Sequence, residues 1–194
     1  VMLEHYQIDV FLVINNIDLT SPDQVEKIRD LYASAGYDVV LVSAQEAINI
    51  DGLKAKLKGK ITAMAGPSGV GKSSLLNSLS LDHQVETGKV SRKTSRGKHT
   101  TRHSELFLID KDTYILDTPG FSSIDLSFID EERDVKSYFR EFRDYEDKCR
   151  FQDCIHVNEP QCEVKKQVEK NIIKKSRYDN YLFIYQEIKN KRRY

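Results

Sequence analysis

The sequence predicts an α/β fold, a parallel Rossmann-like sheet with helices on both faces, followed by a small helical domain. Over the first 120 residues, short apolar runs alternate with segments of helical spacing, as in strands joined by helices. A glycine-rich segment lies between one such run and the next helix. After Gly120 the apolar residues recur only at helical spacing. We therefore expect two domains, residues 1–124 and residues 125–194.

Five apolar runs are the expected strands of the first domain: residues 8–14, 38–42, 61–65, 105–109 and 113–116. The last two follow each other closely enough to pair as a hairpin around Lys111 and Asp112.

Helices are expected between these strands. Ser21, Pro22 and Gln24 have the order of an N-cap, a first helical residue and a capping-box partner, and that helix should end near Gly36. A second helix should begin after Asp51 and Gly52, and a third at Lys72.

The second domain should consist of helices with apolar stripes. A first stripe is followed by a cysteine cluster, and a basic tail ends the chain. Tyr178, Tyr181 and Tyr185 in the tail could stack on RNA bases, but their helical spacing favours packing in a core. The first stripe consists of Val135, Tyr138, Phe139, Phe142 and Tyr145.

Length and composition limit the possible classes of protein. The 194 residues suffice for one full core and a small appendage. No apolar run approaches the roughly 20 residues that span a bilayer, and no secretory signal is visible, so we expect a cytoplasmic protein without a membrane partner.

The formal net charge of zero conceals local segregation. Residues 165–194 hold ten Lys and Arg against three Asp and Glu, and residues 89–103 hold six Lys and Arg and no acid. Residues 125–147 hold nine acids and four bases. A single charged run is usually a solvated face, but two basic blocks are more typical of a nucleic-acid partner.

The segment from Gly66 to Ser73 reads GPSGVGKS and fits the phosphate-loop pattern GxxxxGK[ST]. The expected strand before it and helix after it are the context that this motif requires. Backbone N–H groups of the loop and the helix N-terminus would face phosphates. We expect Lys72 to reach the β and γ phosphates and Ser73 to bind Mg²⁺. A merely flexible glycine turn is the weaker alternative.

Asp117 begins the segment DTPG at the end of an apolar strand. In a nucleotide triphosphatase, this carboxylate can hold Mg²⁺ through water, and the Gly120 N–H can contact the γ-phosphate. Upstream, GKHTTR has the hydroxyls of a first switch loop, and either Thr100 or Thr101 should coordinate Mg²⁺.

Guanine selectivity is expected from the segment NNID, which follows the first strand. The Asp18 carboxylate can accept the N1–H and the 2-amino group of guanine, a donor pair that adenine lacks. The backbone of Ser43 and Ala44 could contact O6. Expected nucleotide-binding residues are Asn15, Asn16, Ile17, Asp18, Ser43, Ala44, Gly66, Pro67, Ser68, Gly69, Val70, Gly71, Lys72, Ser73 and Ser74.

The guanine motif precedes the phosphate loop, the reverse of the order in ordinary small GTPases. Through NNID, GPSGVGKSSLLN, RGKHTTRH, DTPGF and CRFQDCIHVNEPQC, nearly the whole chain resembles the circularly permuted, ribosome small subunit-dependent GTPases called RsgA, YjeQ or EngC. The resemblance implies GTP binding, slow hydrolysis stimulated by the small ribosomal subunit, and a role in late maturation of that subunit with its rRNA as partner. We also expect a monomer.

Two departures from the family pattern affect these expectations. Asn16 stands where the NKxD motif has lysine, so we expect guanine selectivity to survive while affinity falls. The OB-fold barrel of the family has no counterpart, so we expect the chain to be a fragment that also lacks one strand upstream of Val1.

All three cysteines fall within 14 residues, and with one histidine they have the spacing C-x4-C-x-H-x5-C. Three thiolates and an imidazole complete a tetrahedral Zn²⁺ site with no open position, which indicates a structural ion. Accidental clustering of free thiols is the alternative. The expected ligands are Cys149, Cys154, His156 and Cys162.

Phe121 stands where many GTPases carry a water-orienting glutamine, which predicts low intrinsic turnover. We expect docking on rRNA to order residues 89–103 and to place His99 or another residue near the attacking water. A nucleotide-gated RNA-binding module with little hydrolysis is the alternative function, and a P-loop kinase or ATPase is disfavoured by Asp18.

Overall fold

The computed structural model describes residues 1–80, 105–117 and 126–191. The chain divides into two compact units. The first comprises Val1–Leu12, Glu26–Val39 and Ile124–Tyr194, and the second Val13–Val25 and Val40–Ser123. The first unit thus combines the C-terminal segment with two stretches from the N-terminal part of the chain.

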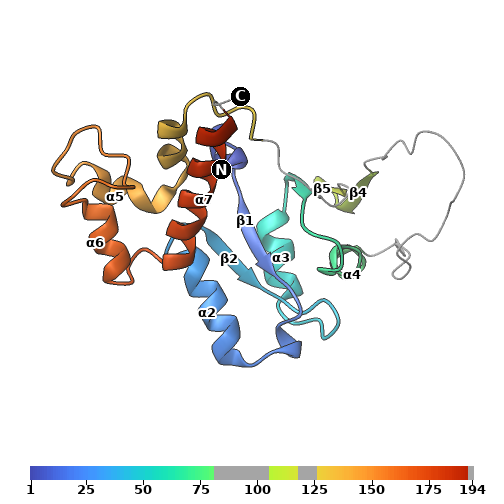
Figure 1. The fold of residues 1–194 in the computed structure, drawn as a ribbon. Coiled ribbons are helices and arrows are strands. Elements are labelled where there is room, and N and C mark those ends of the chain that lie inside the picture. The colour runs from blue at the N-terminus through green and yellow to red at the C-terminus, as the bar shows by residue number, and fades with distance from the viewer. Residues whose placement is uncertain (81–104, 118–125, 192–194) are drawn as a thin grey trace, which may run out of the picture. The chain divides into compact units, whose positions relative to one another are not determined.

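The described strands form two sheets (Figure 1). Strands β1 (Phe11–Ile14) and β2 (Asp38–Leu41) are neighbours in one sheet. The other has the order β3-β5-β4, with β3 (Ile61–Met64), β4 (Glu105–Asp110) and β5 (Thr113–Asp117). Strand β5 pairs parallel to β3 and antiparallel to β4, which confirms the expected hairpin.

The faces of the three-stranded sheet differ in burial. Phe107 and Ile115 lie opposite each other in the register of β4 and β5, and both are buried. On the other face Ile61, Leu106 and Leu108 are 75%, 54% and 49% exposed. The hydrophobic contacts of this sheet are therefore concentrated on one side.

Helix α2 (Pro22–Ala33) ends in the way that the sequence predicts. Gly36 has φ +81°, and the N–H of Tyr37 donates to the carbonyl of Tyr32 at 3.2 Å. A left-handed glycine with this bond is the usual end of an α-helix, because it satisfies a free carbonyl of the last turn.

The first strand is shorter than expected, because the chain begins with a helical turn, α1 (Met2–His5). Gln7 has φ +53°, and the Ile8 N–H donates to the Leu3 carbonyl at 2.9 Å. These residues close the turn, so β1 starts only at Phe11.

Two helices of the second unit carry leucines into its core. Helix α3 (Ile50–Leu57) buries Leu53 and Leu57, and α4 (Lys72–Leu79) buries three leucines, Leu75, Leu76 and Leu79. Helix α3 begins slightly earlier than expected, after Asn49. Helix α4 begins at Lys72, as predicted.

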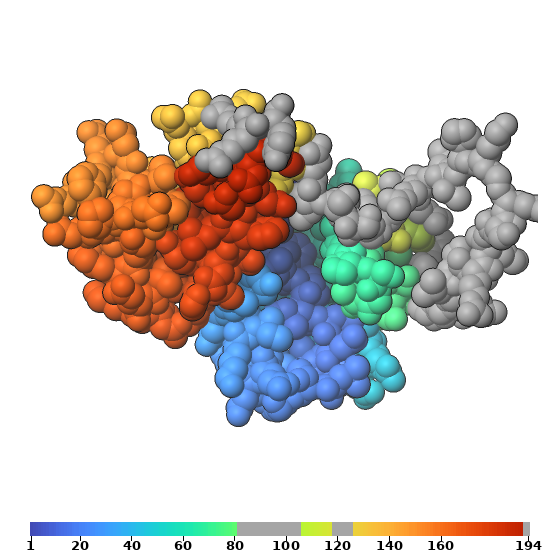
Figure 2. Space-filling model, viewed as in Figure 1, coloured from blue at the N-terminus to red at the C-terminus, as the bar shows by residue number. Residues whose placement is uncertain are grey.

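The apolar stripe of the first unit lies on short turns rather than on one long α-helix. The 3-10 helices η2 (Glu132–Tyr138) and η3 (Arg140–Phe142) lead into α5 (Arg143–Glu146). Helices α6 (Glu163–Glu169) and α7 (Lys175–Lys191) follow and lie against each other (Figure 2).

Aromatic rings form the centre of this unit. The ring centroid of Tyr181 lies 5.4 Å from that of Phe139 and 5.1 Å from that of Phe142, both in edge-to-face geometry. Tyr181 is fully buried and Tyr185 is buried, which confirms that the tail tyrosines at these positions pack in a core.

Two arginines of the C-terminal segment, Arg140 and Arg177, contact the N-terminal stretches of the same unit. Arg177 forms two hydrogen bonds with the nearly inaccessible carboxylate of Glu141, at 2.7 and 3.2 Å. Arg140 pairs with Glu4, and both guanidinium groups lie over the ring of Tyr37. Arg177 is therefore largely buried, although it counts toward the basic block of residues 165–194.

No helix in the described ranges has both the length and the hydropathy that crossing a membrane requires.

Replacing Phe142 with alanine should lower the free energy of unfolding by about 3–5 kcal/mol, because a fully buried ring leaves a cavity. Urea denaturation followed by circular dichroism measures this. The control Phe183→Ala removes a ring that is 63% exposed and should change stability by less than about 0.5 kcal/mol. Equal effects would show that Phe142 does not pack as described.

Candidate nucleotide and metal sites

The phosphate-loop segment connects β3 to α4, the context that the motif requires. Gly69 and Gly71 have φ of +85° and +87°, which side-chain-bearing residues rarely adopt. The Lys72 ammonium donates to the carbonyls of Gly66 and Pro67, at 2.7 and 2.9 Å. The lysine therefore folds over the loop, with its charge at the position where phosphates would bind.

Asn15 joins the guanine motif to the phosphate loop. Its side-chain Nδ2 donates to the Val70 carbonyl at 3.3 Å, and its Oδ1 accepts from the Ala44 N–H at 3.0 Å. A Cβ added at Gly71 would lie 2.5 Å from Asn15 Nδ2, so a side chain there would displace the Asn15 amide as well as strain the left-handed backbone. Three segments singled out from the sequence thus meet at one side chain.

The residues that follow Asn15 turn away from the strand. Asn16 has φ +62°, a left-handed conformation that asparagine tolerates better than most residues. The next residues form η1 (Ile17–Leu19), whose first N–H donates to the Val42 carbonyl at 3.3 Å. The Asp18 carboxylate is exposed.

Ser43 has a structural role in its loop. It is fully buried, and its hydroxyl accepts the Glu46 N–H at 3.1 Å. The neighbouring Ala44 N–H is bonded to Asn15, so the guanine O6 contact expected from this segment has to use another N–H or a rearranged loop.

Asp117 is the last residue of β5 and stands beside Met64, the last residue of the parallel strand β3. Its Oδ1 is buried and has no hydrogen-bond partner within the described residues. A buried carboxylate oxygen without a partner is unfavourable, and a cation at this edge of the sheet would satisfy it. Ser73, in the first turn of α4, is half-buried.

Several expected site residues lie outside the described ranges: His99, Thr100, Thr101, Gly120 and Phe121.

The four expected metal ligands come together in the first unit. Their donor atoms all lie within 4.8 Å of one another and could hold a metal ion. The sulfurs of Cys149 and Cys162 are 3.9 Å apart, and His156 Nδ1 lies 3.6 and 3.3 Å from these two sulfurs. The cluster is largely buried, with Cys149 its most accessible member.

Burial sets the protonation of this cluster. It lowers the pKa of His156 to about 4, helped by the Lys136 ammonium, so the imidazole is neutral and able to bind a metal at pH 7. It raises the pKa of Cys154 to about 12, so the metal-free thiol keeps its proton. Metal binding would therefore displace protons from the cluster.

The groups that hold the metal-site loop were not identified from the sequence. The Tyr178 and Tyr181 hydroxyls donate to the carbonyls of His156 and Ile155, and the Lys136 ammonium donates to the Cys154 carbonyl. The Glu159 carboxylate accepts two backbone N–H groups of the loop. The tyrosine and lysine contacts join distant segments and have no local motif, although tyrosine at helical spacing indicates that this face of the tail is buried.

The RsgA GTPase family model matches residues 1–127. Curated relatives include "Small ribosomal subunit biogenesis GTPase RsgA" of Agathobacter rectalis, 46% identical over all of this chain and 64% of the relative. The protein of the same name from Alkaliphilus metalliredigens is 42% identical over all of this chain and 66% of the relative. The chain thus spans just under two thirds of the length of these relatives.

Two solved structures are similar. YjeQ from Thermotoga maritima has a TM-score of 0.74 and 39% identity over 96% of this chain and 62% of that one. YloQ, described as a circularly permuted GTPase, has a TM-score of 0.75 and 33% identity over 98% of this chain and 60% of that one. With the guanine motif joined to a phosphate loop that follows it in the sequence, the chain has the α/β fold of circularly permuted GTPases and belongs to the RsgA GTPase family.

Proposed function

We propose that this chain binds GTP and hydrolyses it to GDP and phosphate, stimulated by the small ribosomal subunit during late maturation of that subunit. The observation that carries the proposal is the pair of Asn15 hydrogen bonds, which join the guanine motif, the Ser43–Ala44 segment and the phosphate loop. The names of the relatives support the ribosomal partner. A monomer in the cytoplasm is part of the proposal.

In this proposal the loop amides and Lys72 hold the phosphates, and Asp18 selects guanine. Among the described residues, the Asp18 carboxylate has no hydrogen bond or ion pair, so it is available to the two guanine donors. A charged acceptor with paired donors contributes about 1.5–3 kcal/mol per hydrogen bond, and this energy is lost with adenine. Asn16 lacks the long stem of lysine, so less apolar surface covers the base.

Ser73 and Asp117 would hold Mg²⁺, which neutralises phosphate charge when bound. The unpartnered Asp117 Oδ1 fits this assignment. Thr100 or Thr101 would complete the ion's shell, the Gly120 N–H would contact the γ-phosphate, and His99 would approach the attacking water. Turnover should be slow without the ribosomal partner, because Phe121 cannot orient that water.

Zn²⁺ is the ion proposed for the cysteine cluster. A tetrahedral zinc with Zn–S near 2.3 Å and Zn–N near 2.0–2.1 Å separates two sulfurs by about 3.8 Å and a sulfur from a nitrogen by about 3.6 Å. The separations of 3.9, 3.6 and 3.3 Å in the cluster are close to these values. The neutral imidazole is the form that zinc binds.

The proposed activity is tested by GTP turnover with and without purified small ribosomal subunits. We expect low turnover alone and a strong increase with subunits. Lys72→Ala should lower turnover by about 100-fold or more, as for loss of a group that stabilises transition-state charge. Lys27→Ala, which changes an exposed lysine of α2, is the matched control. GTP binding without turnover under both conditions would favour the nucleotide-gated RNA-binding module instead.

Asn15→Ala should weaken GTP binding about tenfold or more, because two hydrogen bonds that position the phosphate loop are lost. Titration with a fluorescent GTP analogue measures this, and the exposed Asn190→Ala serves as control. Unchanged affinity of Asn15→Ala would mean that the joined loops do not form the nucleotide site.

Chelation of the bound metal should release one zinc per chain and lower the helical circular dichroism signal, because the cluster lies in the core of the first unit. The three thiols should then react quickly with a thiol reagent, and added zinc should protect them again. Equal thiol reactivity before and after chelation would exclude a zinc site at these residues.

A further inference from the structure

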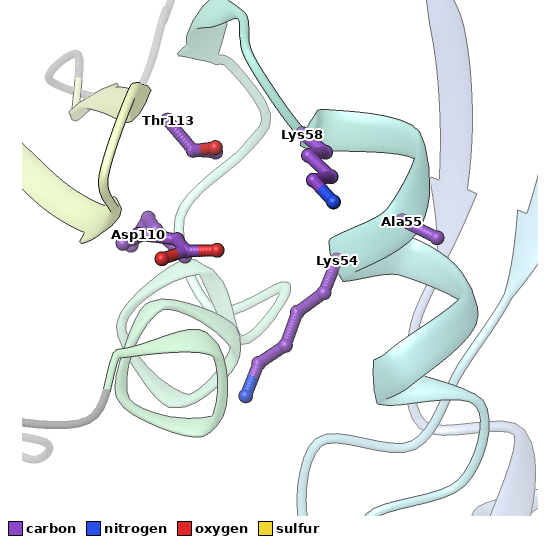
Figure 3. A pocket seen from close by; sticks show the side chains of 6 residues that line it. Lys54, Ala55, Lys58, Asp110 and Thr113 are labelled. Carbon is purple, nitrogen blue, oxygen red and sulfur yellow. The ribbon is translucent and has the colours of Figure 1, made fainter.

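A hollow in the second unit is lined by none of the residues of the candidate nucleotide and metal sites. It has a volume of about 270 Å³ and lies between the C-terminal half of α3 and the β4–β5 hairpin (Figure 3). Its lining consists of Lys54, Ala55, Lys58, Ile109, Asp110 and Thr113.

The hollow and the phosphate loop lie at opposite ends of the same strands. Thr113 begins β5 and lines the hollow, whereas Asp117 ends β5 beside the last residue of β3. At about 3.3 Å per strand residue, the two ends are about 13 Å apart. A ligand in the hollow would therefore not touch a nucleotide at the phosphate loop.

The charged residues that line the hollow are two lysines and one aspartate, so the lining has a net positive charge. Lys54 lies in the last turn of α3 and Lys58 is the residue that caps this helix, and both line the hollow. Neither ammonium has a hydrogen bond or ion pair among the described residues. Thr113 Oγ1 accepts the Gly59 N–H at 3.0 Å, which leaves its own hydrogen available to a ligand. The Asp110 carboxylate is the one opposing charge in the lining, and it already accepts the Lys111 N–H.

The chain around the hollow is also basic. Lys54, Lys56, Lys58 and Lys60 alternate along seven residues, and Lys111 lies in the hairpin turn. Lys58, Lys60 and Lys111 are exposed and close in sequence to the lining residues, which suits a ligand that carries more than one negative charge. The hollow itself admits one compact anionic group. A phosphodiester of a nucleic-acid backbone has both properties.

We propose that this hollow binds a backbone phosphate of RNA, with Lys54, Lys58 and the Thr113 hydroxyl as donors. The inference rests on the proposed function in one respect, since a ribosomal partner supplies the RNA. It adds a contact on the GTPase part of the chain, distinct from both basic blocks and from the nucleotide.

The test measures poly(U) binding by the full chain at several salt concentrations. Each neutralised phosphate of a single strand contributes about −0.7 to the slope of log K against log salt concentration. The double variant Lys54→Gln/Lys58→Gln should make the slope shallower by about 0.7 and weaken binding several-fold at 50 mM salt. Asp110→Asn, which removes the opposing charge, should strengthen binding.

Lys56→Gln is the matched control, because it makes the same change in the same helix but lies two residues from each lining lysine and outside the hollow. Its slope should remain that of the native chain. An unchanged slope in the double variant, or an equal change in Lys56→Gln, would overturn the proposal. Circular dichroism melting must match between variants, and Lys58→Gln alone, at an exposed position, serves if the double variant is unstable.

Two further measurements distinguish an RNA site from a small-anion site, and this proposal from the proposed function. If inorganic phosphate raises the melting temperature of the native chain but not of the double variant, while poly(U) binding is equal in both, the hollow is a small-anion site and the RNA assignment is wrong. GTP turnover with subunits is measured on the same preparations. If subunits do not stimulate GTP turnover by the native chain although poly(U) still binds, the proposed function is contradicted. The proposal for the hollow is not affected by that result.

Discussion

The parallel pairing of β3 with β5 is the constraint on which the candidate nucleotide site depends. It sets Met64 beside Asp117, so the strand that leads into the phosphate loop and the strand that ends in the carboxylate finish at one edge of the sheet. Phosphoryl transfer needs positioned charges more than reactive side chains, and a sheet edge provides rigid positions. The Asn15 side chain then connects a third segment to this edge through backbone groups of Val70 and Ala44. Neither contact requires a bound nucleotide, so the loops are held close to one another in advance of binding.

The expected metal ligands are also part of the hydrophobic core of the first unit. Cys154 and Cys162 belong to the hydrophobic cluster that contains Phe142 and Tyr181, and the His156 ring lies 5.6 Å from that of Phe142. Burial raises the pKa of the Cys154 and Cys162 thiols, so metal affinity would depend on how this core packs. The core also includes residues of short 3-10 turns, and side-chain hydrogen bonds from α7 hold the ligand loop. An ion in this position would stabilise a segment whose own regular structure is limited.

Features encoded within about ten residues were predictable from the sequence, and features that depend on distant segments were not. The phosphate loop, the hairpin at Lys111 and the cysteine spacing are local patterns, and the structure has each of them at the expected place. The Asn15 bond to Val70 spans 55 positions, and the pair of Arg177 with Glu141 spans 36. Such pairs join segments that only the tertiary fold brings together, which no local spacing reports. The same reason explains why residues 1–12 belong to the compact unit of the C-terminal segment.

Charge counted along the sequence is a poor guide to charge on the surface. Arg177 raises the count of the basic tail, yet it lies inside against Glu141. The lysines between residues 54 and 60 form a shorter run than the two basic blocks, yet two of them line a hollow with one carboxylate. The nucleotide edge and this basic edge are the two ends of β3 and β5. In the two proposals together, the chain would hold an anion at each end of one sheet at the same time, since about 13 Å keeps the two charges beyond the Debye length at physiological salt.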